Sequence, residues 1–261
     1  MNKTSTGLAL STALLAGLTL VGGCASEGAK PPSERMKQGQ ETTTPPPGAR
    51  AEAKLVLPPG VSQAPAPFAG TGWSAMCDGL TLTGWRETGF AGRGEVRCQA
   101  GVIVFGMGEP FTGINYTNEF PKMNYEVALD AMRLTGSDFF CGLTVPVGTN
   151  FCSLIVGGWG GSLVGISSLD GMDASENETT KFTSFETGRW YRIRLRVTEK
   201  KIEAWIDKEK LVDVATAGKR ISVRPGDIEM SEPFGLAAWQ TSAAYREIRF
   251  RRVSGPAGKD D

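Results

Sequence analysis

The amino-acid sequence predicts an all-β protein built as a sandwich of two sheets. Between residues 71 and 253, apolar and polar residues alternate in short runs, as in strands that bury one face. The chain has 34 Gly and 15 Pro, which suits a fold with many turns. No segment of this region keeps a helical period for more than a turn or two. About a dozen short strands at this spacing are typical of a two-sheet sandwich.

The first residues read as a targeting signal. Lys3 precedes a short apolar run at residues 8–20, which ends in Val21-Gly22-Gly23-Cys24 and resembles the signal of bacterial lipoproteins. The resemblance implies that residues 1–23 are removed and that Cys24 carries acyl chains, which would hold the protein on a membrane surface. We therefore expect an exported lipoprotein of the outer membrane or cell surface. The alternative is an ordinary secretory signal with a coincidental cysteine.

Residues 24–67 are predicted to be a tether. They are rich in Pro, Thr and Ala and lack apolar periodicity, so they cannot bury enough surface to fold. Their proline content should keep them extended as a spacer. The folded domain is expected at residues 68–254, followed by a disordered tail at residues 255–261.

The clearest strand pair is predicted within residues 190–213. Strict alternation places every second side chain on the core face, and residues 198–201 form the hairpin loop. The register predicts the buried pairs Val197–Ile202, Leu195–Ala204 and Ile193–Ile206. On the other face it predicts the pairs Arg196–Glu203, Arg194–Trp205 and Arg192–Asp207, two of them ion pairs and one a cation–π contact.

The other strands are placed by the same pattern. Ala100-Gly101 marks a tight hairpin, and a Pro-Val-Gly-Thr-Asn turn is expected at residues 146–150. The remaining longer strands are expected at residues 95–99, 102–105, 111–117, 125–134, 139–145, 151–156, 163–169, 234–239 and 245–253.

Several motifs resemble the 3-keto-disaccharide hydrolase domain family, in the same order and across about residues 73–253. The resemblance implies a concanavalin A-like jelly roll of two antiparallel sheets, a carbohydrate ligand, and cleavage of 3-keto-glycosides. The motifs are Cys77-Asp78-Gly79-x-Thr81-Leu82-x-Gly84-Trp85, Gly101-Val102-Ile103, Glu119-Phe120, Gly188-Arg189-Trp190-Tyr191-Arg192-Ile193, Gly235-Leu236 and Arg246-Glu247-Ile248-Arg249-Phe250.

The chain departs from this family in two segments. Cys141-Gly142-Leu143 stands where members commonly carry Asn-Ser-Gly-Ile, and residues 236–240 replace a segment that commonly contains His. The chain has no His at all, which excludes Ser-His-Asp and Cys-His catalysis and His metal ligands. A non-catalytic carbohydrate-binding or adhesion module on the same fold is therefore the alternative function.

Glu126 and Asp130, with Asp138 nearby, are the acids expected on strands. A 3-keto group acidifies the neighbouring C–H, so one carboxylate could act as a general base without His. Glu126 and Asp130 would share a face about 13 Å apart, beyond the roughly 5–10 Å of paired glycosidase carboxylates. The alternative is solvated charge at a sheet edge.

Aromatic residues are the candidates for sugar binding. Trp159 lies among four glycines, which allow a bent loop and an exposed ring. Trp239 and Gln240 occupy the segment where the family carries its Gln and His. Arg194 beside Trp205 is a further candidate. For each tryptophan the alternative is a core or surface packing role.

Two further features concern metals and disulfides. Asp170, Asp173 and Glu176 lie in an acidic loop whose oxygen atoms could hold Ca²⁺, or could simply be solvated. Cys141 would fall opposite Cys152 if their strands form a hairpin, so the two could form a disulfide or remain buried thiols.

The balance of charge limits which classes of partner the chain can attract by its net charge. The chain has 28 basic and 28 acidic residues, which gives no general attraction for nucleic acid. We therefore expect no nucleic-acid partner, while the two resemblances imply a carbohydrate partner and a membrane contact through Cys24.

Overall fold

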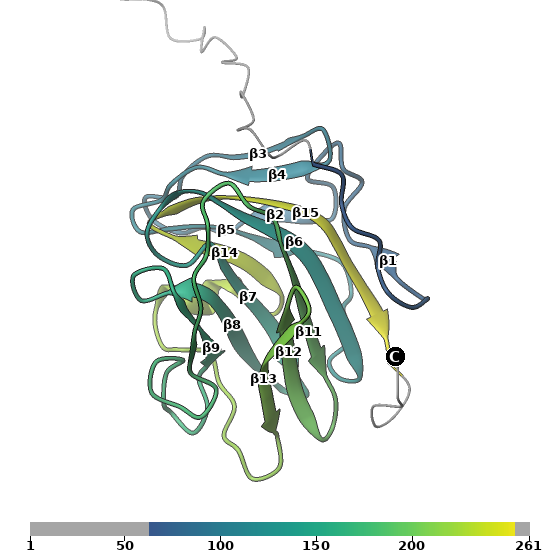
Figure 1. The fold of residues 1–261 in the computed structure, drawn as a ribbon, viewed down its shortest axis with the longest axis vertical. Helices are drawn as coiled ribbons and strands as arrows, with labels where there is room; N and C mark the ends of the chain where they lie inside the picture. The colour runs from purple at the N-terminus through teal and green to yellow at the C-terminus, as the bar shows by residue number, and fades with distance from the viewer. Residues whose placement is uncertain (1–62, 254–261) are drawn as a thin grey trace, which may run out of the picture. The chain divides into compact units, whose positions relative to one another are not determined.

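The computed structural model describes residues 63–253. In this part the chain forms fifteen strands and one short 3-10 helix, arranged as two antiparallel sheets packed face to face (Figure 1). The predicted two-sheet sandwich is therefore confirmed. The predicted signal, Cys24, most of the tether and the tail lie outside the described residues. Within residues 63–253, no helix is long and apolar enough to span a membrane.

Sheet A contains the central strand pair and both long strands. Its order is β13 (Glu209–Ala215), β12 (Lys201–Ile206), β11 (Tyr191–Val197), β6 (Tyr125–Gly136), β15 (Thr241–Arg252), β4 (Val102–Phe105) and β3 (Val96–Gln99), with β1 (Ser74–Ala75) pairing on β15.

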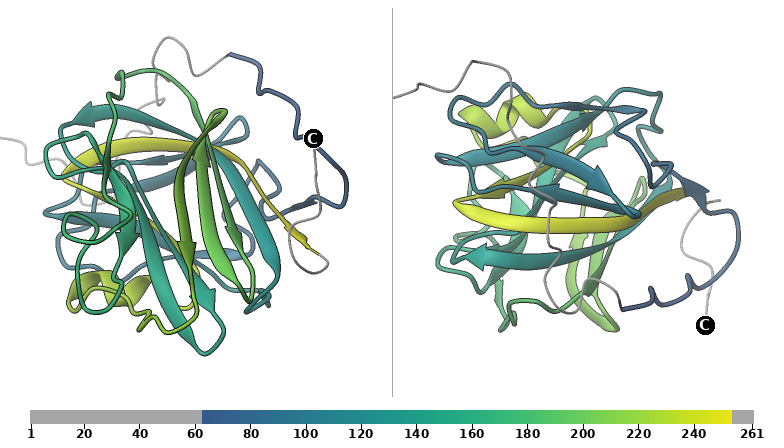
Figure 2. Two further views of the ribbon diagram at one scale, coloured as in Figure 1. Left: turned by 60° about the horizontal axis from the view of Figure 1, so that its bottom comes forward. Right: turned by 90° about the horizontal axis from the view of Figure 1, so that it is seen from above.

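Sheet B carries the connections that surround a cleft. Its order is β10 (Lys181–Phe182), β9 (Leu163–Ser167), β8 (Asn150–Gly158), β7 (Cys141–Val147), β14 (Gly235–Trp239), β5 (Phe111–Tyr116) and β2 (Trp85–Glu87). The helix η1 (Asp227–Ser231) lies beside β5 and β14 (Figure 2), where Asn115 Nδ2 donates to Met230 O at 3.0 Å.

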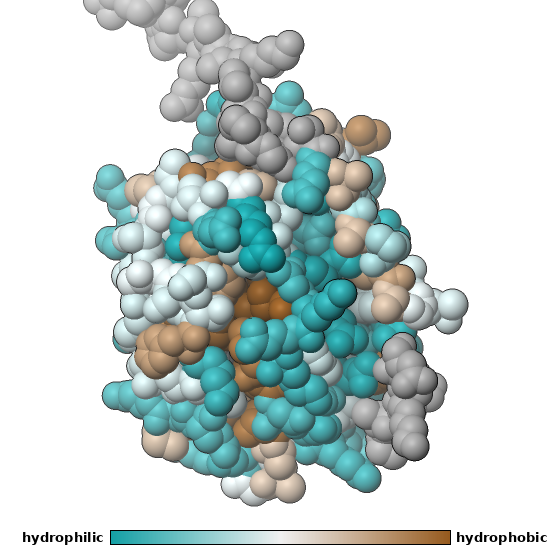
Figure 3. Space-filling view, viewed as in Figure 1, coloured by the Kyte–Doolittle hydropathy of each residue, from teal (hydrophilic) through white to brown (hydrophobic). Residues whose placement is uncertain are grey.

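The main core lies between the sheets. Val127 and Leu129 of β6 and Leu195 of β11 are fully buried, as the alternation predicts. In the space-filling view, apolar residues also show in a hollow between β9 and β13, where the edges of the two sheets face each other (Figure 3).

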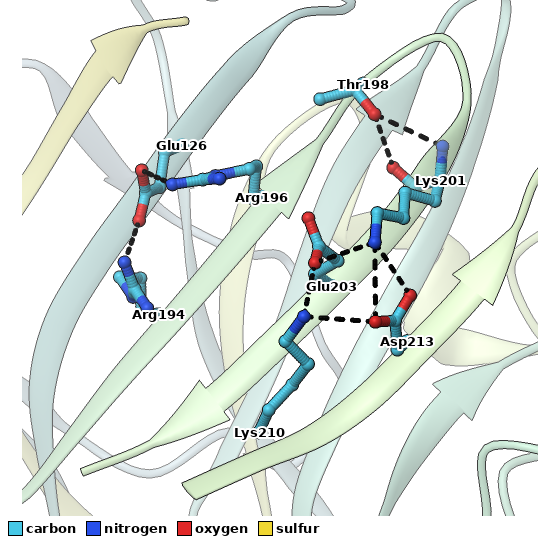
Figure 4. Close-up of polar contacts among 8 residues, drawn as sticks. All are labelled: Glu126, Arg194, Arg196, Thr198, Lys201, Glu203, Lys210 and Asp213. Atoms are coloured by element: carbon cyan, nitrogen blue, oxygen red, sulfur yellow. Dashed lines mark hydrogen bonds and ion pairs between the residues drawn. The ribbon is translucent and has the colours of Figure 1, made fainter. Parts of the chain in front are cut away.

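The β11–β12 hairpin has the predicted register. Val197 pairs with Ile202, and Arg194 pairs with Trp205, whose ring lies 3.9 Å from the Arg194 guanidinium carbon. The predicted ion pairs are wrong, because β6 lies on the other side of β11 and supplies acidic partners. The Arg196 side chain pairs with Glu126 instead of Glu203 (Figure 4).

The same correction applies at the other end of the hairpin. The Arg192 side chain pairs with Asp130 of β6. Asp207 receives the Arg189 guanidinium at 2.8 Å and the backbone N–H of Arg192 at 3.0 Å.

The β7–β8 hairpin differs from the prediction in register. Val147 pairs with Asn150, so Gly148 and Thr149 alone form the turn and Pro146 remains in the strand. Cys141 therefore lies opposite Val156, and Cys152 opposite Val145. The predicted disulfide is not formed: all four cysteines of the described part are free thiols, namely Cys77, Cys98, Cys141 and Cys152.

Residues 63–73, here called the N-terminal segment, contact the outer face of sheet A. Arginines of β11 and β15 donate to three of its backbone carbonyls. The pairs are Arg192 with Ala66 O at 2.8 Å, Arg251 with Thr71 O at 3.4 Å, and Arg246 with Gln63 O. The Arg192 guanidinium also lies 4.0 Å from the Phe68 ring centroid. Residues 63–67, predicted to belong to the tether, thus contact the domain.

Candidate functional site

Small residues shape the outer face of sheet B. Gly113, Ala237, Gly142 and Gly165 lie in one cross-strand row, with Ile155 between the last two. A Cβ atom on Gly142 would lie 2.9 Å from the Phe139 ring, and one on Gly165 would lie 2.9 Å from a loop carbonyl. These glycines therefore let rings and loops lie directly on the sheet.

A cleft of about 500 Å³ opens above this row. Its volume falls in the range of small-molecule sites. Loops from distant parts of the chain form its walls: the segment before β7, the β8–β9 and β9–β10 loops, and the loop that leads into η1. The cleft therefore joins residues that are far apart in sequence.

One wall of the cleft is aromatic. Trp239 meets Phe111 edge to face, with ring centroids 4.5 Å apart, and lies 6.5 Å from Phe139. Trp159 lies at the tip of the β8–β9 loop with 41% of its surface exposed. The Arg224 guanidinium carbon is 5.9 Å from the Trp159 ring centroid. Exposed aromatic faces of this kind can stack on the apolar face of a sugar ring.

Three carboxylates line the same cleft, at Asp138, Asp173 and Asp227. The Asp138 carboxylate accepts the backbone N–H of Phe139 at 2.7 Å and that of Gly160 at 3.3 Å. Backbone groups thus hold Asp138 beside the loop that carries Trp159.

Asp173 has both side-chain and backbone partners. One carboxylate oxygen accepts the Ser167 hydroxyl and the Ala174 N–H, the latter at 2.8 Å, and the other pairs with Arg224 at 2.8 Å. The Arg224 side chain is 58% exposed, so further guanidinium N–H groups face solvent at the cleft. The cleft can therefore donate to and accept from sugar hydroxyl groups.

The structure brings two of the predicted sugar-binding residues together. Trp159 and Trp239 both line the cleft. Gln240, which follows β14, is exposed, and its side chain is not part of the cleft lining. Arg194 lies on the outer face of sheet A, in the other layer of the sandwich.

Glu126 and Asp130, the predicted catalytic acids, also lie on the outer face of sheet A. The Glu126 side chain is 0% exposed and receives three guanidinium groups, from Arg194, Arg196 and Arg251. Asp130 receives two, from Arg192 and Arg246. Charge-assisted bonds already occupy these carboxylates, and neither lines the cleft. The structure therefore gives them a role in holding sheet A together.

The predicted calcium ligands do not meet at one point. Asp170 pairs with Lys219 at 3.2 Å, Asp173 pairs with Arg224, and Glu176 is exposed. The backbone N–H of Arg220 and then the Lys219 ammonium hold the pKa of Asp170 below its ordinary value. Among residues 63–253, no group of three or more Asp, Glu, Cys or His is placed to hold a metal ion. The structure therefore does not bring the three predicted calcium ligands together.

Sequence reasoning missed several cleft residues. Asp173 was expected only as a metal ligand, while Ser167, Arg224 and Asp227 were not proposed for the site. The Arg224-Pro225-Gly226-Asp227 stretch reads as a turn. Nothing in its composition indicates that the turn folds over β8 and β9, so the signal for a site residue is absent there.

A comparison with family models confirms the family that the sequence motifs predict. The family model described as a 3-keto-alpha-glucoside-1,2-lyase-like domain matches residues 72–251. No curated protein matches the chain.

Three solved structures are similar to the chain at low sequence identity. A Bacillus subtilis carbohydrate-binding module shares 12% identity at a TM-score of 0.44, covering 64% of this chain and 95% of its own. Domain 4 of a Geobacillus stearothermophilus extracellular arabinanase, in complex with arabinotriose, shares 14% sequence identity at a TM-score of 0.45. The match covers 70% of this chain and 92% of that domain. A Bacillus subtilis protein of unknown function with a galectin-like fold shares 11% sequence identity at a TM-score of 0.47. The match covers 66% of this chain and 90% of that protein.

Proposed function

The chain belongs to the 3-keto-alpha-glucoside-1,2-lyase-like domain family, and on that premise we propose that the cleft on sheet B binds a 3-keto-glycoside and cleaves its glycosidic bond. The observation that carries this proposal is the meeting of Trp159 and Trp239 with the carboxylates of Asp138 and Asp173 in one cleft. The aromatic rings would hold the sugar, and a carboxylate would perform the proton transfer.

The chemistry follows from the ketone. A carbonyl at C3 acidifies the C2–H bond, so a carboxylate can take the C2 proton. The electron pair of that bond forms a C1–C2 double bond as the C1–O bond breaks. The departing aglycone oxygen takes a proton from water or from the newly protonated acid. Addition of water across the double bond would complete a net hydrolysis.

We assign the proton acceptor to Asp138. Its carboxylate is held by the N–H groups of Phe139 and Gly160, which leaves lone pairs on both oxygens for a substrate. Asp173 is already engaged by Arg224 and Ser167. The Asp173–Arg224 pair would therefore bind and orient sugar hydroxyl groups.

The test is release of nitrophenol from a nitrophenyl 3-keto-glucoside by the full chain. Asp138→Asn should lower kcat by about 10²–10⁴-fold, the usual contribution of a positioned base. Trp159→Ala should mainly raise KM. Glu126→Gln is the control and should keep the kcat of the folded protein. Undiminished turnover in Asp138→Asn would refute the assignment of the base.

A non-catalytic carbohydrate-binding module is the second candidate. It is favoured by the absence of His from the chain and by the ion pair that engages Asp173. On this alternative, the wild-type chain releases no nitrophenol, yet it binds glycans on an array through Trp159 and Trp239. Alanine at either tryptophan would then abolish that binding.

We also propose that Cys24 is lipidated and anchors the domain at the outer membrane or cell surface. The support is the Val21-Gly22-Gly23-Cys24 motif after an apolar run. Cys24→Ala should shift the protein from the membrane fraction to the soluble fraction. Retention of the variant in the membrane fraction would contradict the proposal.

A further inference from the structure

Arg133 lies at a position where the strand pattern calls for an apolar residue. It continues the inward-facing series of β6, after Val127, Leu129 and Ala131, and is only 6% exposed. Its guanidinium carbon lies 5.2 Å from the ring centroid of Phe140, a core residue. The side chain thus reaches from sheet A toward sheet B through the interior of the sandwich.

The Arg133 guanidinium ends beneath the two loops that form one end of the cleft. Its Nη2 donates to Gly161 O at 2.8 Å and to Gly157 O at 3.3 Å, at the two ends of the loop that carries Trp159. The same Nη2 lies 3.3 Å from Asp138 O. A single buried group therefore contacts both the exposed tryptophan's loop and the backbone of the proposed base.

The loop is shaped to receive this group. Gly157, Trp159, Gly160 and Gly161 all have left-handed backbone angles, with φ of 78°, 47°, 84° and 105°. A Cβ atom on Gly157 would lie 2.6 Å from Arg133 Nη2, and one on Gly161 would lie 3.2 Å from it. The glycines therefore both allow the tight curl and leave the space that the guanidinium occupies.

Burial of this charge is costly. The three bonds go to neutral carbonyl oxygens, and among the described residues the buried Nε of Arg133 has no hydrogen-bond partner. A well-packed apolar residue often serves stability as well as a buried charge does. Departures from a local rule of this kind are expected where function requires them.

We infer, building on the proposed function, that Arg133 is a positioning residue that fixes the Trp159 loop and Asp138 in the arrangement that holds one sugar. It does not touch the substrate. Its guanidinium sets the distance between the stacking ring and the carboxylate, because it ties the carbonyls of both loops to the same atom.

The experiment compares Arg133→Met with Arg133→Lys in the full chain. Arg133→Met should raise KM at least tenfold and increase acrylamide quenching of Trp159 fluorescence, measured as the difference from the same protein carrying Trp159→Phe. Its midpoint of urea unfolding should stay within the range of the wild type, or rise. Arg133→Lys keeps a donor that can reach a carbonyl, so it should recover part of both properties.

Arg196→Met is the matched control. Arg196 is also buried and also has an unpartnered Nε within the described part, but it lies on the outer face of sheet A. The Arg196→Met substitution should change neither KM nor the acrylamide quenching of Trp159 fluorescence. Should Arg133→Met fail to fold, Gly161→Ala disturbs the same contact from the loop side and should show the same increase in quenching.

The outcomes separate this inference from the proposed function. Absence of turnover and sugar binding in the wild-type chain would refute the proposed function, while the quenching measurement would still test the loop. Wild-type quenching of Trp159 in Arg133→Met, or an equal increase in Arg196→Met, would overturn the positioning role.

Discussion

Glu126 shows that the partners of a residue decide what it can do. Its position on a strand suggested a general base, yet its side chain has no exposed surface and receives three guanidinium groups. The sequence places Arg194 and Arg196 correctly on the polar face of β11. It does not show that β6 is the neighbour of β11, and that pairing sets the role of Glu126.

Glu126→Gln should therefore affect stability more than activity. The amide keeps the volume but removes the negative charge, which leaves three arginines around a neutral group. We expect the free energy of unfolding to fall by about 3–5 kcal/mol, as when one partner of a buried ion pair is lost. Urea unfolding of the two proteins measures the difference.

The control for this prediction is Glu87→Gln. Glu87 pairs with Arg93, but both side chains are at least 40% exposed, and exposed pairs contribute about 0–1 kcal/mol. Equal losses in the two variants would contradict the structural role of Glu126.

At the scale of elements, the alternating pattern predicts register where one face must be buried. The β11–β12 hairpin follows this rule because a slip of one residue would turn Ile193, Leu195 and Val197 outward. Both faces of β7 and β8 are largely buried, so alternation does not fix their register. The two-residue turn at Gly148 and Thr149 fixes it instead.

β13 and the cleft were harder to predict for different reasons. β13 is an edge strand in which Val212 and Val214 alternate with charged and exposed residues, and this apolar run is short. The two cleft tryptophans stand out by their glycine-rich or family-like surroundings. Their partners Asp138, Asp173 and Arg224 come from separate loops, and no local pattern brings those loops together.

The N-terminal segment offers a prediction at the same scale. The Phe68 ring lies 4.0 Å from the Arg192 guanidinium carbon and 5.1 Å from the Trp73 ring centroid. Phe68→Ala should lower the free energy of unfolding by about 1–2 kcal/mol, through a lost cation–π contact and a lost aromatic pair. Chemical denaturation of the full chain measures the loss.

Phe182→Ala is the matched control, because Phe182 is 71% exposed on the edge strand β10. The free energy of unfolding of Phe182→Ala should differ from that of the wild type by less than about 0.5 kcal/mol, as for ordinary surface substitutions. A change in Phe68→Ala as small as that of the control would mean that the segment does not stabilise sheet A.

At the scale of the whole molecule, two cysteines and two tyrosines within residues 63–253 are fully buried, and all four ionise at alkaline pH. Burial raises the pKa of Cys152 to about 12 and that of Cys141 further still. Burial also raises the pKa of Tyr125 and Tyr245 well above 10.0. Their hydroxyl groups donate to Pro146 O and Phe140 O, each at 2.6 Å, and join the two sheets.

The sign of the pH dependence follows from these shifts. Each folded pKa lies above its unfolded value, near 9.0 for Cys and 10.0 for Tyr. The stability these groups contribute is therefore complete below pH 9 and is lost as the pH rises toward the folded values. Each group adds up to about 1.4 kcal/mol per pH unit to the slope.

The measurement is the urea midpoint between pH 7 and pH 11. The four buried groups should leave this midpoint unchanged up to about pH 9 and should lower it at higher pH. Tyr245→Phe keeps the ring but removes one ionising group, so its midpoint should fall less steeply above pH 10. A wild-type midpoint that stays level up to pH 11 would contradict the prediction.

The N-terminal segment also has a mechanical consequence. The chain enters the domain across the outer face of sheet A, held in turn by Arg246, Arg192 and Arg251, before β1 pairs with β15. A pulling force on the N-terminal end would first strain these arginine contacts one after another. Because these contacts and β1 all belong to sheet A, such a force would reach sheet A before sheet B and its cleft.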